Sequence, residues 1–285
     1  MKIAYVVGDD DPKDPDPDLD IPFVIESANK LKIDLSFPNW QDKDIKWNDF
    51  DAAVIRSTWN YVPFRDEFVS WSKKVERETK LYNSSEIIEW NTDKKYLLEL
   101  EEDGIPIIPT EFCSDLNEAD KHIAWAFEQS DAIAIKPSIG AGARLAGRAK
   151  SINDAQILLK NIFDNKRIAM IQPYVESVDL EGEKAIVVID GKLSHVANKV
   201  PALTQGGHGD GAGLAKIDSK IEEIFEIVKS KLKYWNDLLY ARIDVVKLDG
   251  SYVLMELELT EPWLFMKYRP ESSLDLLNAI LKRIN

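Results

Sequence analysis

The stretch from Tyr240 to Phe265 constrains this chain most, because it predicts two β-strands joined by a tight turn at Asp249-Gly250. Side chains alternate between the two faces of a strand, so Glu256 and Glu258 share one face of the second strand. The other face of that strand is apolar and holds Met255, Leu257 and Leu259.

The length of the turn decides whether Asp244 joins the two glutamates. A strict two-residue loop places Asp244 opposite an odd-numbered residue, on the wrong face. A three-residue loop, with Gly250 left-handed as a bulge, pairs even-numbered positions with each other. We adopt the three-residue loop. It predicts one polar patch that gathers Arg242, Asp244, Leu254, Glu256 and Glu258.

Three carboxylates on one patch repel each other unless a cation lies between them. Hard oxygen ligands at this density suit Mg²⁺, which keeps several waters and shares its coordination shell with substrate phosphates. The sequence therefore predicts a magnesium site formed by Asp244, Glu256 and Glu258. The alternative is a solvated strand face with acidic decoration.

The composition bounds the class of protein. A chain of 285 residues with 45% hydrophobic and 30% charged residues is expected to be globular and to hold two or three domains. Its net charge of -14 argues against nucleic acid and anionic membrane surfaces as partners. The single cysteine, Cys113, excludes an internal disulfide framework. We find no signal peptide and no apolar run of membrane-spanning length, and we expect a cytoplasmic protein.

Alternating strands and helices predict an N-terminal α/β domain. Its strand from Asp51 ends in a polar and aromatic segment, and ligands of open α/β sheets bind at the carboxyl ends of strands. The alternative is that the aromatic side chains only cover the sheet edge. The substrate-contact candidates are Arg56, Ser57, Thr58, Trp59, Asn60 and Tyr61.

Two later segments are candidates for holding a nucleotide. Lys136 ends a predicted strand and precedes a loop of small residues, and such a loop can bind phosphates through its backbone amides. Five glycines lie within the eight residues from Gly206 to Gly213, a composition that suggests a lid closing over a ligand. A plain flexible loop is the alternative.

These segments, in this order, resemble the ATP-grasp superfamily. The resemblance covers nearly the whole chain and is strongest from Asn91 to Leu264. The chain is similar to the prokaryotic glutathione synthetase-like branch and, within it, to the cycloserine-forming O-ureido-D-serine cyclo-ligases. Segments similar to Arg56–Tyr61 and to Glu256–Pro262 carry this resemblance.

The resemblance implies an α/β (α+β) ATP-grasp architecture. A Rossmann-like domain over residues 1–88 would precede two α+β lobes that clasp ATP, a small one over residues 89–174 and a large one over residues 175–285 that carries the metal-binding hairpin.

The same resemblance implies roles for individual residues. Phosphates of ATP would be neutralised by Lys94 and Lys136, and Glu183 would accept hydrogen bonds from the ribose. Asp244, Glu256 and Glu258 would hold magnesium, two ions in all, with Mn²⁺ as a substitute. Arg242 and Lys199 would stabilise the charge that develops on the transferred phosphoryl group. The segment against adenine would include Gln172, Tyr174 and Val175.

The activity implied is ATP-dependent ligation of a small, amino-acid-like carboxylate to an amine, as an amide or a ring, through an acyl phosphate, with release of ADP and phosphate. The partners would be small-molecule carboxylate and amine substrates, on a monomer or homodimer. Two alternatives remain at this stage: an ATP-binding regulator of the same fold without turnover, and phosphoryl transfer to a hydroxyl group.

Overall fold

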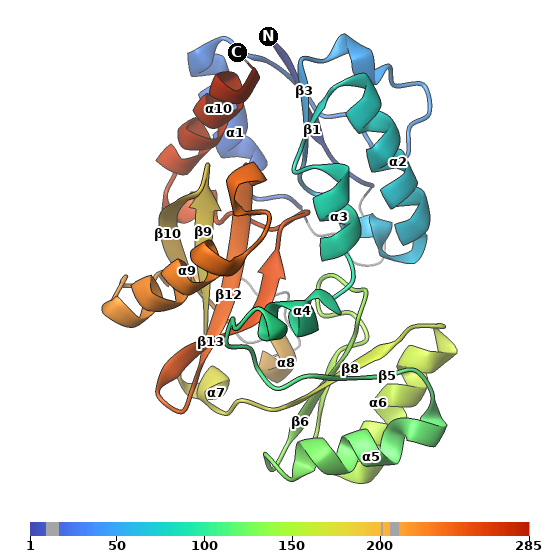
Figure 1. Ribbon diagram of the computed structural model, residues 1–285. Helices are drawn as coiled ribbons and strands as arrows, with labels where there is room; N and C mark the ends of the chain where they lie inside the picture. Colours follow the sequence, from blue (N-terminus) through green and yellow to red (C-terminus); the bar gives the residue numbers. More distant parts are fainter. Residues whose placement is uncertain (10–16, 201, 206–210, 285) are drawn as a thin grey trace.

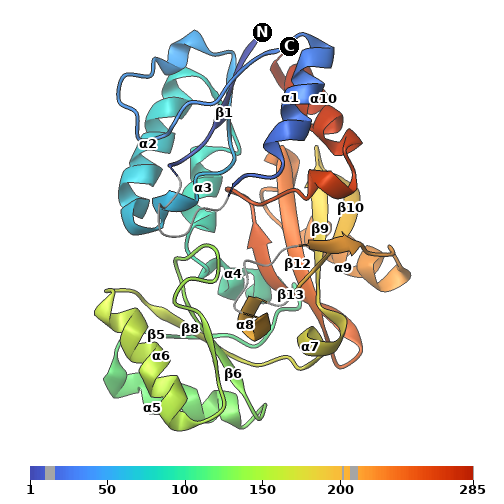
Figure 2. The same cartoon turned by 180° about the vertical axis from the view of Figure 1, so that it is seen from behind.

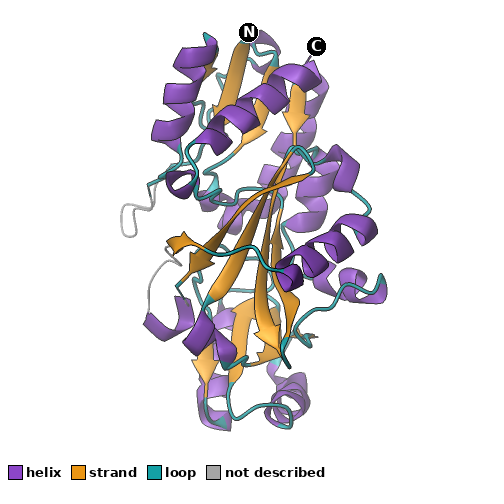
Figure 3. Ribbon diagram, turned by 90° about the vertical axis from the view of Figure 1, so that its left-hand side faces the viewer, coloured by secondary structure: helices purple, strands orange, loops and turns teal. Residues whose placement is uncertain are grey.

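The computed structural model describes residues 1–9, 17–200, 202–205 and 211–284, and arranges them as three β-sheets along one axis (Figures 1 and 3). Both ends of the chain lie beside the N-terminal sheet (Figure 1). Most of the predicted glycine-rich lid, Gly206–Asp210, lies outside the described residues. None of the helices within these ranges is both long enough and apolar enough to cross a membrane.

The N-terminal sheet is parallel, in the order β2-β1-β3-β4. Its strands are β1 (Lys2–Val6), β2 (Asp34–Ser36), β3 (Ala52–Ile55) and β4 (Lys80–Tyr82). Apolar residues fill both faces, as expected for parallel strands covered on two sides. The helices of this region are α1 (Ile21–Leu31), α2 (Arg65–Glu78) and α3 (Ser85–Asn91), with the short 3₁₀ helices η1 (Trp47–Asp49) and η2 (Trp59–Phe64).

The sheet at the end of the molecule opposite the N-terminal sheet is antiparallel, in the order β5-β8-β6-β7 (Figure 1). Two helices cover one face through a compact apolar cluster. Each begins at a side-chain cap, since Asp115 accepts from the backbone N–H of Asn117 and Ser151 from that of Asp154. The elements are β5 (Glu111–Cys113), α5 (Leu116–Phe127), β6 (Ile133–Pro137), β7 (Gly147–Ala149), α6 (Ile152–Asp164) and β8 (Ala169–Pro173).

The third sheet is antiparallel, in the order β11-β10-β9-β12-β13. Its strands are β9 (Glu183–Ile189), β10 (Lys192–Lys199), β11 (Gly211–Leu214), β12 (Tyr240–Leu248) and β13 (Ser251–Glu258). The helices around it are α4 (Tyr96–Glu102), α7 (Ser177–Glu181), α8 (Ala202–Gln205), α9 (Ser219–Lys231) and α10 (Glu271–Ile284), with η3 (Trp235–Asp237) and η4 (Met266–Tyr268).

Two apolar cores hold this sheet. One lies between the sheet and α9 and α4. The other packs α10 against α1 and joins the third sheet to the N-terminal sheet, as the view from behind shows (Figure 2). The first and last helices of the chain therefore belong to one structural layer. The division into domains at residues 88/89 and 174/175 stays a prediction.

The hairpin of β12 and β13 brings Asp244, Glu256 and Glu258 to one side, as predicted, but with a different turn and register. Leu248 pairs with Ser251, so the turn is a two-residue loop, with both Asp249 (φ 50°) and Gly250 (φ 82°) left-handed. The predicted three-residue loop is therefore wrong. A bulge at Met255 supplies the extra residue instead, because the register shifts between Asp244–Glu256 and Val245–Leu254.

The bulge also corrects the predicted faces of two residues. Leu254 pairs with Val245 and lies in the apolar core under α9, not beside Arg242 as predicted. Met255, expected on the apolar face, lines the cleft described below. The prediction that Asp244 lies on the same side of the hairpin as Glu256 and Glu258 is confirmed, since Asp244 pairs with Glu256 and Arg242 with Glu258.

Candidate active site

The three sheets border one cleft with a volume of about 240 Å³. Most of the predicted site residues line it. They are Ser57, Trp59, Asn60, Tyr61, Lys94, Lys136, Gln172, Tyr174, Val175, Glu183, Lys199, Arg242, Glu256 and Glu258. Three predicted residues do not line the cleft: Arg56, Thr58 and Asp244, which are all buried.

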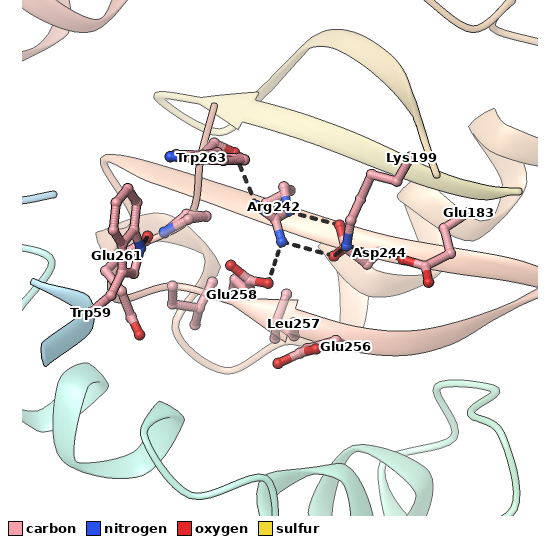
Figure 4. A network of polar contacts seen from close by, with 12 residues as sticks. Trp59, Glu183, Lys199, Arg242, Asp244, Glu256, Leu257, Glu258, Glu261 and Trp263 are labelled. Atoms are coloured by element: carbon pink, nitrogen blue, oxygen red, sulfur yellow. Dashed lines mark hydrogen bonds and ion pairs between the residues drawn. The ribbon is translucent and has the colours of Figure 1, made fainter. Parts of the chain in front are cut away.

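The end of the hairpin forms a charged network under the cleft (Figure 4). Arg242 binds both oxygens of Asp244, with its Nε 2.9 Å from Oδ1 and its second guanidinium nitrogen 3.0 Å from Oδ2. The same guanidinium also contacts Glu258 and donates to the carbonyl of Trp263 at 3.2 Å. Cross-strand pairing explains this arrangement, because Arg242 faces Glu258 and Asp244 faces Glu256.

Two lysines bring further positive charge to the network. Lys199 Nζ lies 2.6 Å from Asp244 Oδ2 and 3.0 Å from Glu183 Oε2. Lys94 Nζ lies 3.0 Å from Glu256 Oε1, across the cleft from the hairpin. The acid groups thus alternate with cations, which resolves the repulsion that three adjacent carboxylates would otherwise suffer.

The donor atoms fit a divalent cation only in part. Among residues 1–9, 17–200, 202–205 and 211–284, no three His, Cys, Asp or Glu side chains converge on one point. Both oxygens of Asp244 are already bonded to Arg242 and Lys199, and its side chain is 0% exposed. The carboxylates of Glu256 and Glu258 open into the cleft and are the hard oxygen donors that suit Mg²⁺.

Burial and neighbouring charge set the protonation of this network. Burial is the largest influence on Glu258 and raises its pKa to about 8, with Glu256 and Asp244 adding to the effect and Arg242 opposing it. For Asp244 and Glu256 burial is likewise the largest influence and favours the neutral form. The adjacent cations outweigh it and hold both pKa values below their usual range.

The lysines predicted to meet phosphates both face the cleft. Lys94 donates to the carbonyl of Gly140 at 2.8 Å, at the start of the small-residue loop after β6. The side chain of Lys136 makes no hydrogen bond or ion pair with any described residue, and burial lowers its pKa although Glu256 and Glu183 partly oppose this. Residues 140–144 and Ala146 also line the cleft, so the lysines and the loop share one wall.

The residues predicted to lie against adenine occupy the end of β8 and the segment after it. Gln172 donates to Thr110 Oγ1 at 2.8 Å, and the Tyr174 hydroxyl contacts the Asp179 carboxylate. Val175 belongs to an apolar cluster that includes Met255 and lines the same end of the cleft. Apolar side chains line this end, which suits a heteroaromatic ring.

Arg56 and Trp59 bind the backbone that forms one wall of the cleft. The Arg56 guanidinium is 1% exposed, donates to the carbonyl of Pro262 at 2.5 Å and lies 3.7 Å from Asp20 Oδ2. Trp59 donates through its indole N–H to the carbonyl of Glu261 at 2.9 Å. The segment expected to contact substrate therefore also binds the backbone that follows β13.

Two residues at this wall were missed by sequence reasoning. Asp20 is 2% exposed and accepts from the backbone N–H groups of Leu264 (2.7 Å) and Met266 (2.8 Å). Glu261 lines the cleft directly. No periodicity marks Asp20, which lies at the end of an acidic loop. Glu261 follows the end of the strand, where face alternation stops giving information.

Comparisons with known proteins show the family of the chain. The model of the prokaryotic glutathione synthetase ATP-grasp domain matches residues 107–267, more than half of the chain. The chain belongs to this ATP-grasp family. The model of the N-terminal domain of the D-cycloserine synthetase DcsG matches residues 3–83 of the ATP-grasp chain.

Individual relatives cover the ATP-grasp chain from end to end. The cycloserine biosynthesis protein DcsG of Streptomyces lavendulae is 28% identical over an alignment of 282 residues, and the match covers 94% of each chain. The crystal structure of D-cycloserine synthetase DcsG superposes with a TM-score of 0.89 at 25% identity and covers all of both chains. D-alanine–D-alanine ligase from Bacillus anthracis, complexed with ATP, shares the fold: its TM-score is 0.72, its identity 17%, and the match covers 100% of this chain and 97% of that one.

The predicted ATP-grasp architecture is therefore confirmed, and so is the predicted class of reaction. The protein is an ATP-dependent carboxylate–amine ligase that acts on a small substrate and forms a C–N bond.

Proposed function

We propose that this ligase closes a ring within one amino-acid-like molecule and that O-ureido-D-serine is its substrate. The relatives named above support the proposal, because similarity to the cycloserine synthetase extends over both the ATP-grasp region and the N-terminal region. The carrying observation in the site is the contact of Arg242 and Lys199 with Asp244, beside the cleft-facing carboxylate of Glu256.

In the proposed reaction the substrate carboxylate attacks the γ-phosphorus of ATP, forming an acyl phosphate and releasing ADP. A nitrogen of the same molecule then attacks the acyl carbon and expels phosphate. Arg242 and Lys199 stabilise the charge on the transferring phosphoryl group, while Lys94 and Lys136 neutralise the phosphates of ATP. The protein otherwise positions the reactants and excludes water, which would hydrolyse the acyl phosphate.

Magnesium would be held by Glu256 and Glu258, with Asp244 joining when ATP phosphates compete for Arg242 and Lys199, and it would neutralise phosphate charge. We propose two ions, with Mn²⁺ as a substitute. Val175 and Tyr174 would flank adenine beside Gln172, and Glu183 would accept from the ribose. Ser57, Trp59, Asn60 and Tyr61 would form the substrate side, with Arg56 and Thr58 supporting them from below.

The test is ADP formation by the purified protein with O-ureido-D-serine, followed by mass spectrometry of the product. We expect substrate-dependent ADP release and a cyclic product. Pairs of free D-amino acids serve as the control, because a linear ligase would join them. ADP release with D-alanine that yields a dipeptide would refute ring closure, and ATP binding without any carboxylate-stimulated ADP release would refute the ligase.

A further inference from the structure

The end of the cleft beside Trp59 and Tyr61 contains one glutamate that forms no ion pair with any residue that the structure describes. Every other glutamate that lines the cleft has an ion pair: Glu183 with Lys199, Glu256 with Lys94, and Glu258 with Arg242. Among the described residues, the fourth such glutamate, Glu261, forms no ion pair.

The surroundings of Glu261 are aromatic. Trp59 and Trp263 pack edge to face with ring centroids 5.6 Å apart, and both line the cleft. The Tyr61 hydroxyl faces the Glu261 carboxylate. Figure 4 shows Glu261 with the two tryptophans at one end of the network, beside Glu258. Indole faces attract cations through their quadrupole, so the rings and the carboxylate favour the same kind of ligand group.

The position of Glu261 is fixed independently of any ligand. Its carbonyl accepts the indole N–H of Trp59, and the carbonyl of Pro262 accepts from the buried guanidinium of Arg56. Burial raises the pKa of Glu261 to about 7, since Lys94 offsets only part of the effect. A half-buried carboxylate held in this way is poorly solvated. A cationic group from a ligand would compensate for the lost hydration through an ion pair.

Arg242, close to Glu261, indicates that the ligand also carries a carboxylate. Arg242 donates to the carbonyl of Trp263, two residues from Glu261, and it faces the cleft where the substrate carboxylate is activated in the proposed function. An α-amino acid bears its ammonium and carboxylate on the same carbon. Its two charged groups therefore need an acidic and a basic partner side by side, which this end of the cleft provides.

We infer that Glu261, between Trp59 and Trp263, binds the α-ammonium group of the amino-acid substrate. The inference rests on the proposed function for the placement of the substrate carboxylate. The ammonium donates to the Glu261 carboxylate and lies against the indole rings. The carboxylate of Glu261 then acts in recognition, and the transfer of the phosphoryl group does not require it.

The experiment is a calorimetric binding titration of the full chain, loaded with Mg²⁺ and a non-hydrolysable ATP analogue. The probes are O-ureido-D-serine and D-serine, each against its counterpart without the amino group, 3-(ureidooxy)propanoate and 3-hydroxypropanoate. We expect the amino acids to bind at least about 10-fold more tightly than the counterparts, because hydrogen bonds to charged groups discriminate by this much.

The variant Glu261→Gln should weaken binding of the amino acids by about 10- to 100-fold and leave the counterparts and the ATP analogue unchanged. Trp263→Leu should weaken the amino acids by about 2- to 30-fold. The matched control is Glu101→Gln, at an exposed position, which should change nothing.

Several results would overturn the inference: equal binding of amino acids and counterparts to the unmodified protein, no binding of any probe, or equal losses for both series in Glu261→Gln. The proposed ring closure fails separately, in the ADP and product assay. Selective binding of the amino acids without turnover would remove the proposed reaction and leave this subsite.

Discussion

The buried guanidinium of Arg56 offers the sharpest test of how the cleft is held. The substitution Arg56→Met removes the charge and retains most of the apolar stem. It deletes the 2.5 Å hydrogen bond to the carbonyl of Pro262 and the charge that lies 3.7 Å from Asp20. It also removes the cation 4.8 Å from the ring centroid of Tyr240. We expect a stability defect, because every one of these groups is buried.

The magnitude follows from Asp20. Burial raises the pKa of Asp20 from 3.8 to about 6, even though Arg56 and two backbone N–H groups oppose the rise. A rise of about 2 pKa units corresponds to about 3 kcal/mol. Loss of Arg56 leaves this carboxylate without a cation, and breaking a buried ion pair costs about 3–5 kcal/mol. We therefore expect Arg56→Met to lower Tm by about 6–20 °C at neutral pH.

The defect should depend on pH. Because the folded pKa of Asp20 lies above its unfolded value, the stability that its neutral form contributes is complete below about pH 4 and is lost as pH rises through about 6. Without Arg56 the charged form costs more. The difference in Tm between Arg56→Met and the unmodified protein should therefore be larger at about pH 7.5 than at about pH 5.

Scanning calorimetry at both pH values measures this difference. Arg77→Met, at an exposed position of α2, is the matched control and should shift the free energy of unfolding by no more than about 0.5 kcal/mol. The double variant Arg56→Met with Asp20→Asn should recover part of the loss. A defect below about 1 kcal/mol, or one that is the same at both pH values, would refute the reasoning.

Three further predictions concern the active site. Glu256→Gln should lower the rate of ADP formation by at least about 100-fold, since it removes a charge that faces Lys94 and the phosphates; turnover near that of the unmodified protein would contradict this. Gly182→Ala should destabilise the protein by about 2 kcal/mol or more, because φ is +67° and the added Cβ would lie 2.8 Å from the Lys199 carbonyl oxygen. Gly142→Ala is the control: its added Cβ meets no neighbour, and it should cost about 1 kcal/mol. Equal losses in Tm would contradict the role of the contact with Lys199. Removal of divalent cations with EDTA should abolish ADP formation and added Mg²⁺ should restore it, and activity that survives chelation would show that Glu256 and Glu258 hold no essential ion.

The sequence predicted the face of Asp244 correctly for an incorrect reason. Alternation along a strand is reliable, but the position of a bulge depends on which residues the rest of the fold has room for. Here Leu254 is taken into the core under α9 and pairs with the isolated segment at Ile107, so the extra residue falls at Met255. Nothing in a single sequence indicates that the bulge lies at Met255.

The segment Arg56–Tyr61 shows a second limit. Its place at the end of β3 could be predicted from alternating strands and helices, and four of its six side chains do line the cleft. Sequence alone could not separate these from the buried Arg56 and Thr58, because burial here depends on how the folded chain packs around the segment. The partners of Arg56 include Pro262, which is close to it only in the folded chain.

The clamp formed by Asp20 and Arg56 has a consequence for protein synthesis. A ribosome delivers these residues long before it delivers their partners, the backbone from Pro262 to Met266. Until then the Arg56 guanidinium and the Asp20 carboxylate lack these hydrogen-bond partners. We expect a chain that ends before about residue 266 to lack them permanently. Such a fragment would lack a wall of the cleft even if most of its nucleotide-facing residues were present.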